Sequence, residues 1–279
     1  MRQSDPEQQL SIHHRGGASS IARISRIGGA LEGLTLGGVE LIATPSLDYS
    51  EMFFGSVLAP WPNRLADGEF EYEGKIHRVG TLDQDSNANH GLLYDQQMRV
   101  VDHQEESVSL ALGMAEIGYP WPIDLEIEYS ISESQLRVKA NARNRSDEAA
   151  PFAIGFHPYF LTGESFLLEG DFSHRVLSDD RMLPSGVEEI SGLSYSGGEL
   201  DACFYGADAI HLTTPHATIE VALEENLSHF MFYRPRSDVG NLLAIEPMSS
   251  GANTFNLELT KNLLLPGEEK SYRFSVRKL

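Results

Sequence analysis

The residues best suited to acid–base chemistry lie far apart in the sequence, and the first is a histidine inside an apolar run. His157 interrupts A-I-G-F-H-P-Y-F at residues 153–160. Burying its ring without hydrogen-bond partners would cost about 1–3 kcal/mol. Pro158 removes an amide donor, so we expect His157 near the end of a buried strand, with a pKa near neutrality that suits proton transfer. A hydrogen-bonded core histidine with no catalytic role is the alternative.

Two loop segments supply further candidates. His90 follows small polar residues in S-N-A-N-H-G at residues 86–91, which predicts an accessible ring. Asn63 and Arg64 follow two prolines in A-P-W-P-N-R at residues 59–64, and an arginine can donate several hydrogen bonds from one rigid fork. The alternatives are an exposed loop histidine and an arginine that only pins the carbonyl groups of its loop.

Two carboxylates complete the candidate set. Glu246 ends the apolar run L-L-A-I-E, and we expect Pro247 to stop strand pairing there. Partial burial would raise the pKa of Glu246 from about 4.3 and make it a better base near neutral pH. An ion pair with Arg64 is the alternative. Asp201, in G-G-E-L-D, is a weaker candidate because it could equally cap a turn.

Composition narrows the class of partner. The chain has 41 acidic and 21 basic residues among 279, a formal charge of −20, which would repel phosphate backbones and anionic lipids. Cys203 is the single cysteine, so no internal disulfide can form. With neither an export signal nor a run of 18 apolar residues in sight, we expect a cytoplasmic protein that binds no nucleic acid or membrane.

The elements that must position these residues are predicted to be strands. Short apolar or alternating runs recur about every ten residues between Gly, Asn and Asp turn signals, and no linker divides the chain. We therefore expect one all-β domain over residues 1–279, a large antiparallel β-sandwich, with residues 1–18, including His13 and His14, loosely ordered. The expected strands include Glu69–Tyr72 and Ile76–Val79, which form a hairpin, and Phe255–Leu259.

Taken in order, these segments resemble the aldose 1-epimerase family, the galactose mutarotases. Pro158 departs from the pattern, because the family's second histidine is often followed by serine. The matching motifs are Asn63-Arg64-Leu65, Asn89-His90-Gly91, Gly118-Tyr119-Pro120, His157-Pro158-Tyr159-Phe160 and Glu246.

The resemblance implies a galactose mutarotase-like β-sandwich (supersandwich) with an open sugar cleft and no metal or organic cofactor. It implies that Glu246 is the catalytic base and His157 the catalytic acid in interconverting the α and β anomers of an aldohexose. By the same resemblance, the substrate-binding residues are His90, Arg64, Asn63 and Asp201. The protein would act as a monomer or homodimer.

Three other readings use the same residues. A hexose-6-phosphate 1-epimerase would need an added basic cluster, for which Arg234 and Arg236 are the nearest candidates, and the −20 charge argues against a dianionic substrate. A non-catalytic sugar-binding protein could keep the same fold. A metal-dependent cupin-like enzyme could use two histidines and one glutamate, but the sequence has no H-x-H spacing to support it.

Overall fold

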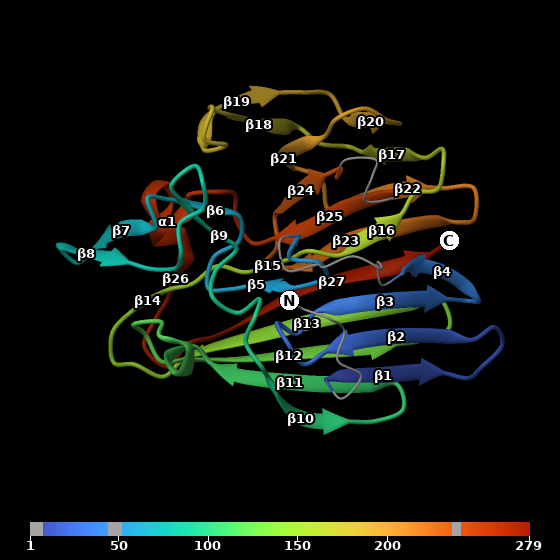
Figure 1. Cartoon of the computed structure of the whole chain (residues 1–279), viewed down its shortest axis with the longest axis horizontal. Coiled ribbons are helices and arrows are strands. Elements are labelled where there is room, and N and C mark those ends of the chain that lie inside the picture. Colours follow the sequence, from blue (N-terminus) through green and yellow to red (C-terminus); the bar gives the residue numbers. More distant parts are fainter. Residues whose placement is uncertain (1–7, 44–51, 236–240) are drawn as a thin grey trace.

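The computed structural model describes residues 8–43, 52–235 and 241–279, and it confirms the predicted all-β, antiparallel fold (Figure 1). Two large sheets pack face to face. The first has nine strands, in the order β10 (Arg99–His103), β11 (Ser107–Gly113), β12 (Ile123–Ile131), β13 (Gln135–Asn144), β27 (Glu269–Lys278), β23 (Thr218–Glu225), β22 (Ala209–Thr213), β17 (Leu167–Gly170) and β20 (Leu193–Tyr195).

The second large sheet has eight strands and carries most of the candidate site. Its order is β19 (Pro184–Glu189), β18 (His174–Ser178), β21 (Asp201–Tyr205), β24 (His229–Tyr233), β25 (Leu242–Met248), β15 (Gly155–Phe156) and β5 (Val57–Leu58), and β16 (Tyr159–Leu161) also pairs with β25.

The remaining elements are smaller. A four-stranded sheet of β1 (Gln9–His14), β2 (Ser20–Ser25), β3 (Leu31–Leu36) and β4 (Val39–Ile42) lies beside β11 and β12 (Figure 1). Three two-stranded ribbons are β6 (Arg64–Ala66) with β9 (Asn87–Asn89), β7 (Glu69–Tyr72) with β8 (Lys75–Arg78), and β14 (Ala150–Pro151) with β26 (Leu263–Leu264). The short helices are η1 (Met114–Ile117), α1 (Thr254–Leu257) and η3 (Leu259–Asn262), and no helix among the described residues is long and apolar enough to cross a membrane.

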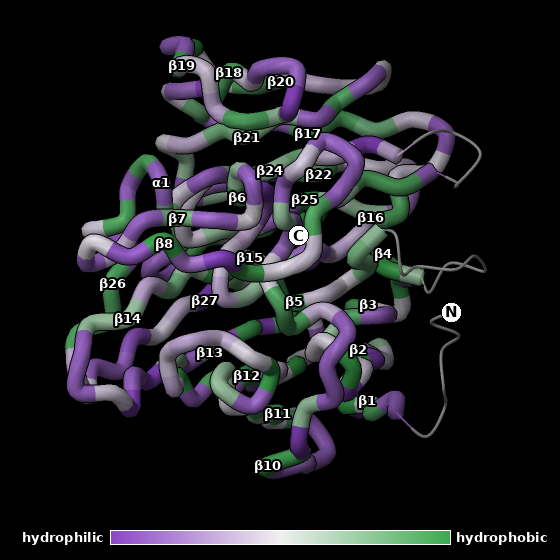
Figure 2. The backbone as a smooth tube through the Cα atoms, turned by 60° about the vertical axis from the view of Figure 1, so that its left-hand side comes forward, coloured by the Kyte–Doolittle hydropathy of each residue, from purple (hydrophilic) through white to green (hydrophobic). Residues whose placement is uncertain are grey.

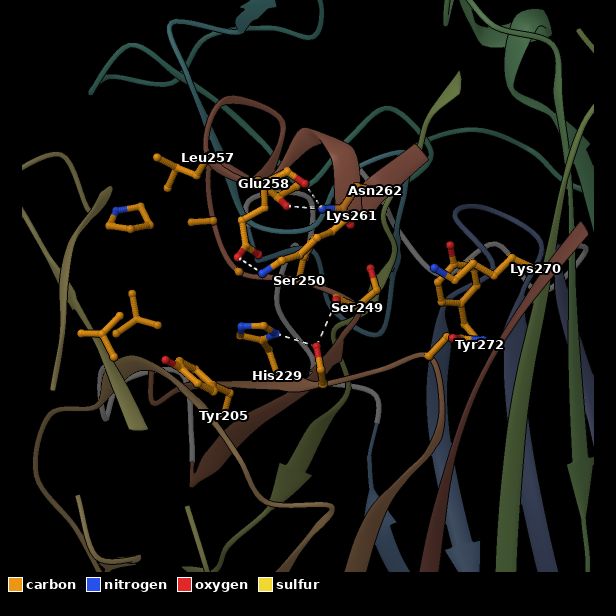
Figure 3. Close-up of a pocket in the computed structure, with 18 of the residues that line it drawn as sticks. Tyr205, His229, Ser249, Ser250, Leu257, Glu258, Lys261, Asn262, Lys270 and Tyr272 are labelled. Atoms are coloured by element: carbon orange, nitrogen blue, oxygen red, sulfur yellow. Dashed lines mark hydrogen bonds and ion pairs between the residues drawn. The ribbon is translucent and has the colours of Figure 1, made fainter. Parts of the chain in front are cut away.

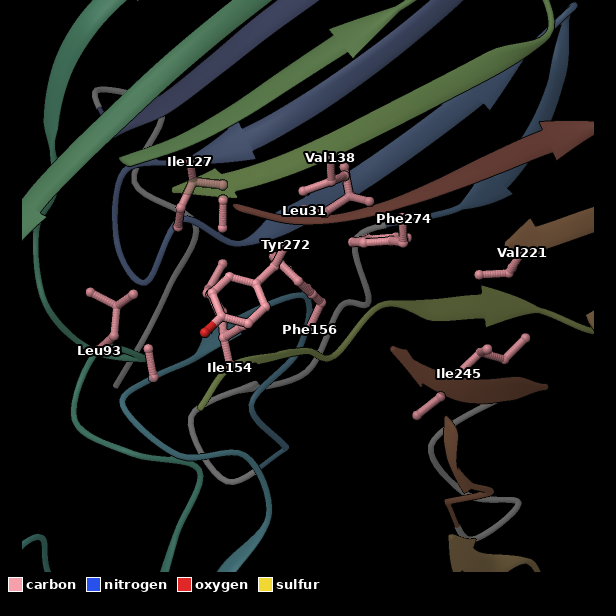
Figure 4. Close-up of a cluster of buried hydrophobic side chains, with 14 of the residues drawn as sticks. Leu31, Leu93, Ile127, Val138, Ile154, Phe156, Val221, Ile245, Tyr272 and Phe274 are labelled. Atoms are coloured by element: carbon pink, nitrogen blue, oxygen red, sulfur yellow. The ribbon is translucent and has the colours of Figure 1, made fainter. Parts of the chain in front are cut away.

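The hydrophobic core fills the space between the two large sheets. Successive strand residues point to opposite faces, so Ile245 of β25 and Phe156 of β15 enter the core, where Phe156 meets Phe274 of β27 at 4.8 Å between ring centroids (Figure 4). Along β12 the same alternation buries every second residue. At the top of the molecule, where hydrophilic and hydrophobic stretches alternate (Figure 2), every residue of β19 except Pro184 is exposed. Glu246 and His157, which follow Ile245 and Phe156, therefore lie on the outer face of the eight-stranded sheet.

The hairpin predicted over residues 67–79 is confirmed. Strands β7 and β8 pair antiparallel, and their turn places Glu73 at φ 51° and Gly74 at φ 71°. Two positive φ angles in a two-residue turn match the right-handed twist of the flanking strands. Phe70 is buried, and Glu71 faces solvent.

Three local predictions are wrong. The expected strand at Phe255–Leu259 is instead α1 and the start of η3, because the Asn262 amide donates to Thr254 Oγ1 (2.7 Å) and to the Glu258 carbonyl (3.0 Å), which ties the chain into helical turns. Residues 9–14 of the segment expected to be loosely ordered form β1, paired with β2 along its whole length. Residues 1–7 lie outside the described residues.

The third wrong prediction concerns Pro247, which does not stop the pairing of β25. Strand β25 continues to Met248, with Pro247 opposite Phe230 of β24. The neighbouring amides of Ile245 and Ser249 donate to Pro158 and Ile154, away from β24. By alternation, the amide that proline lacks would point to the same side, at the break between β15 and β16, so no ladder hydrogen bond is lost.

Candidate active site

The centre of the site is a buried pair, His157 and Glu246, carried by neighbouring strands. His157 Nε2 lies 3.2 Å from Glu246 Oε1, and the two side chains are only 5% and 2% exposed. The His157 backbone is fixed by its amide, which donates to Ser56 (3.0 Å), and by its carbonyl, which accepts from Gly55 (2.9 Å). Its ring stacks on Tyr159 at 4.9 Å between centroids. The break between β15 and β16 thus turns the imidazole toward the carboxyl group.

The ribbon of β6 and β9 brings His90, Asn63 and Arg64 over this pair. The strands pair in register, with Arg64 opposite Asn89. The Asn63 backbone amide donates to His90 Nδ1 (3.2 Å), and the His90 and His157 ring centroids are 5.2 Å apart. Because Nδ1 accepts a hydrogen bond, the proton of neutral His90 lies on Nε2. His90 is therefore a hydrogen-bond donor in this site.

Glycine at position 91 is a steric requirement of that loop. Gly91 has φ 75°, and a Cβ atom there would lie 2.2 Å from the Ala59 carbonyl oxygen. The Leu92 amide then donates to the same carbonyl (2.7 Å). The His-Gly sequence thus holds the imidazole of His90 in place through a close backbone approach that no other residue permits.

Asp201 and Tyr233 lie on the same sheet face, closer to solvent. Asp201 of β21 pairs with Tyr233 of β24, and the next aligned positions lead to Met231 and Glu246. Asp201 is exposed as a residue, yet nearby protein atoms remove enough water from its carboxyl group to raise its pKa. The charge of Arg64 acts in the opposite direction and lowers that pKa. Burial and Asp201 likewise raise the pKa of the Tyr233 hydroxyl. Asp201 and Tyr233 lie side by side on adjacent strands.

Burial dominates the electrostatics of the central pair. It raises the pKa of Glu246 well above its usual value, with Asp201 adding to the rise and Arg64 opposing it. Burial lowers the pKa of His157 to about 3, so the near-neutral pKa expected from the sequence is wrong. His90 is only 6% exposed, so the accessible ring expected from the sequence is wrong; burial and then the neighbouring His157 and Arg64 hold its pKa well below its usual value. Both imidazoles are neutral near pH 7.

Several buried polar atoms of the site have no partner among the described residues. They are Arg64 Nε, Asn89 Oδ1, His157 Nδ1 and Glu246 Oε2. Buried polar groups in folded proteins are nearly always hydrogen-bonded, and unsatisfied ones are common at functional sites. Four such atoms in one cluster indicate groups that bind a polar molecule.

The same cluster does not fit a metal ion well. Ligand atoms of His90, His157 and Glu246 lie within 4.8 Å of one another. A metal on His90 Nε2 would require the ring proton on Nδ1, where it would face the Asn63 amide hydrogen. That arrangement would set two donors against each other, so His90 is suited to donate a hydrogen bond and not to ligate a cation.

All six site residues predicted from the sequence lie at this cluster or at its mouth: Asn63, Arg64, His90, His157, Asp201 and Glu246. Sequence reasoning missed Tyr233 as a site residue. The alternation that places Met231 opposite Glu246 could have revealed Tyr233, two residues further along. Of the basic pair considered for phosphate binding, Arg234 lies over the Phe166 ring (5.2 Å to the centroid) and donates to the Gly198 carbonyl, while Arg236 lies outside the described residues.

Comparisons with known proteins agree with this architecture. The model of the aldose 1-epimerase family matches residues 8–277. An uncharacterized Escherichia coli K12 protein, YihR, is 26% identical over 274 residues, covering 91% of this chain and 89% of its own. A GalM/aldose epimerase homologue from C. elegans has a TM-score of 0.80 at 18% identity, covering 97% of this chain and 99% of its own. A galactose 1-epimerase from Lactobacillus acidophilus NCFM has a TM-score of 0.79 at 19% identity, covering 100% of this chain and 97% of its own.

Proposed function

The chain belongs to the aldose 1-epimerase family, and on that premise we propose that it interconverts the α and β anomers of an aldohexose by acid–base opening and closing of the pyranose ring. The observation that carries the proposal is the buried contact of His157 Nε2 with Glu246 Oε1 at 3.2 Å, beside unpartnered polar atoms of both residues and of Arg64. A site that must both remove and supply a proton needs such a pair.

The reaction requires the C1 hydroxyl to lose a proton while the ring oxygen gains one. The ring bond from C1 to the ring oxygen then breaks, leaving an aldehyde, and rotation about C1–C2 presents its other face. Closure reverses both proton transfers. One acid and one base suffice, and each contributes typically about 10²–10⁴-fold when it lies within hydrogen-bond reach.

Glu246 and His157 supply those groups in the proposal. Burial favours the protonated carboxyl and the neutral imidazole, so the pair rests with one shared proton. Transfer of that proton to His157 gives a carboxylate base and an imidazolium acid, with no proton exchanged with solvent. Arg64 favours this charged form because its guanidinium lowers the pKa of Glu246.

The surrounding residues orient the sugar and stabilise developing charge. His90 Nε2–H donates to a sugar oxygen, which suits an oxygen that becomes more negative as the ring opens. Asp201, Asn63 and Tyr233 bind hydroxyl groups at the more exposed side of the site. Residues that bear a net charge here, Arg64 and Asp201, are of opposite sign, which supports a neutral aldose over a sugar phosphate.

Polarimetry on freshly dissolved pure anomers tests the proposal. We expect the protein to accelerate the change in optical rotation of at least one neutral aldohexose, and to act less well on glucose 6-phosphate than on glucose. A preference for glucose 6-phosphate would instead identify a hexose-6-phosphate 1-epimerase. Absence of acceleration for every sugar, with binding retained, would identify a sugar-binding protein on the same fold.

A further inference from the structure

A second cavity, lined by polar and apolar groups, lies on the same outer sheet face, beyond the ends of β21, β24 and β25 (Figure 3). Its volume is about 620 Å³, within the range of small-molecule sites. His229 and Tyr205 line its floor, α1 and η3 cover it, and Val187 of β19 lies at its rim. None of the residues assigned above to anomer exchange lines it.

An apolar wall separates this cavity from the candidate active site. Cys203, Met231 and Met248 pack together at the boundary, with Val176 against them; Met231 lies opposite Glu246 and Met248 opposite His229. Met248 pairs with His229 and is two residues from Glu246, so the cavity begins about 7 Å along the strand from the proposed base. The three wall residues are at most 9% exposed. Because none of the active-site residues lines the cavity, it is a site of its own.

The tautomer of His229 determines what the cavity can bind. Ser228 Oγ donates its one hydrogen to the Ser249 carbonyl (3.1 Å), so it must accept from His229 Nδ1 (2.8 Å). The ring proton is therefore on Nδ1, and Nε2 is an acceptor. Burial lowers the pKa of His229 to about 4, which keeps Nε2 unprotonated near pH 7. This nitrogen requires a ligand that donates a hydrogen bond.

The other polar groups of the lining add donors and acceptors. Ser250 is 2% exposed, and its Oγ has no partner among the described residues. Lys261 and Glu258 form an ion pair, and Lys270 Nζ lies over the Tyr272 ring, 5.6 Å from its centroid. Tyr205 adds a planar apolar ring 5.2 Å from that of His229. Hydroxyl groups can donate to an imidazole and accept from an ammonium, whereas a fully ionised phosphate can only accept.

We propose that this cavity is a second binding site, for a neutral saccharide of about one hexose unit, distinct from the site of anomer exchange. A sugar satisfies His229 Nε2 and Ser250 Oγ with its hydroxyls and lays C–H groups on the Tyr205 ring. The ligand class follows from this lining alone, so the inference stands or falls independently of the proposed catalysis.

Amide NMR titration with glucose, galactose and maltose tests this inference, with gluconate and inorganic phosphate as anionic probes. We expect resonances around His229 and Ser250 to shift with a dissociation constant of their own, in wild type and in Glu246→Gln. His229→Asn keeps a donor for Ser228 and removes the Nε2 acceptor, so it should weaken this binding about tenfold or more. His211→Asn, at an exposed strand position, should leave it unchanged.

A second variant guards against a folding artefact. Val187 is 55% exposed at the rim, so Val187→Trp should fill the entrance without disturbing the core, and should abolish the shifts around His229 while mutarotation continues. The inference is overturned if no neutral sugar shifts these resonances, if only the anions do, or if the shifts disappear in Arg64→Met and so report occupancy of the active site. If wild-type protein shows these shifts but does not accelerate mutarotation of any sugar, the proposed function is contradicted and this inference is not.

Discussion

The two sites of the outer sheet face each contain a neutral histidine, and they differ in what that histidine faces. At the active-site end, His90 presents an N–H donor and His157 lies 3.2 Å from a buried carboxyl. In the second cavity, His229 presents an acceptor, Lys261 pairs with Glu258, and Lys270 lies over the Tyr272 ring. A buried ionisable pair supports proton transfer, whereas a fixed acceptor beside polar and aromatic groups supports binding only. Four predictions test that contrast.

The largest effect is expected at the proposed base. Glu246→Gln should lower kcat by about 10³-fold or more, since it removes the group that takes the C1 proton while keeping its shape. The free energy of unfolding should not fall, because the variant no longer buries an ionisable carboxyl. Polarimetric rates and urea unfolding measure both. Glu126→Gln, at an exposed position of β12, is the matched control and should change neither. Full activity in Glu246→Gln would rule out this residue as the base.

Equivalent substitutions of His90 and His229 should differ in their effect on kcat/KM. His90→Asn keeps an acceptor for the Asn63 amide and removes the Nε2 donor, so kcat/KM should fall about 10²-fold. His229→Asn should leave kcat/KM for the same aldose within about twofold, because the Cys203, Met231 and Met248 wall separates it from the reacting atoms. Steady-state polarimetry of the two variants side by side checks this. Similar losses in both would mean that the two sites act as one.

The second cavity should also contribute to acid sensitivity. The pKa of His229 is about 4 in the folded protein and about 6.5 unfolded, so the unfolded state gains a proton first as pH falls. Its contribution to stability is present above pH 6.5 and is lost as pH falls toward 4, by about 1–2 kcal/mol between pH 7 and 5. Urea unfolding at pH 7 and at pH 5 should show a smaller loss of unfolding free energy for His229→Asn than for wild type.

The test compares how much unfolding free energy wild type and His229→Asn each lose between pH 7 and pH 5. Glu246, whose pKa is raised, changes stability in the opposite direction, and it contributes equally to both proteins. Identical losses in wild type and His229→Asn would show that the cavity does not keep the imidazole neutral.

The smallest effect is expected at Arg181, which ties the ribbon of β6 and β9 to the β18–β19 hairpin. Its guanidinium donates to Asp67 Oδ1 (2.9 Å), to Asn87 Oδ1 (3.1 Å) and to the carbonyls of Asp85 and Ser86 (both 3.0 Å). We expect Arg181→Met to raise KM about fivefold with little change in kcat, since it loosens the ribbon that orients Arg64 and His90. Arg137→Met, on the exposed side of β13, is the control. A loss confined to kcat would contradict this positioning role.

Much of the active site was predictable from the sequence because its central residues interrupt apolar runs. His157 and Glu246 each follow an apolar run and precede a proline, a pattern that signals an ionisable group held among buried residues, although β25 continues past Glu246 to Met248. Order along the chain then supplied the family resemblance. The strength of burial was not predictable, because the low pKa of His157 comes from burial beside residues that lie far from it in the sequence, such as Glu246 and His90.

The errors in the fold have the same origin in long-range contacts. The sequence Phe255–Leu259 carries strand-like residues, but Asn262, several residues later, closes helical turns around them. Residues 9–14 have little apolar character, and they form a strand because β2 offers a complete edge for pairing. The second cavity gave no sequence signal, since the tautomer of His229 depends on Ser228 and on the carbonyl of Ser249.

Two-dimensional exchange NMR of anomeric protons, at equilibrium between α and β forms, tests the central claim most directly. For at least one neutral aldohexose, wild-type protein should produce α–β exchange cross-peaks faster than buffer, with or without a chelator, and the Glu246→Gln protein should not. Exchange no faster than buffer for every aldose, or exchange abolished by the chelator and restored by a divalent ion, would contradict acid–base anomer exchange by His157 and Glu246.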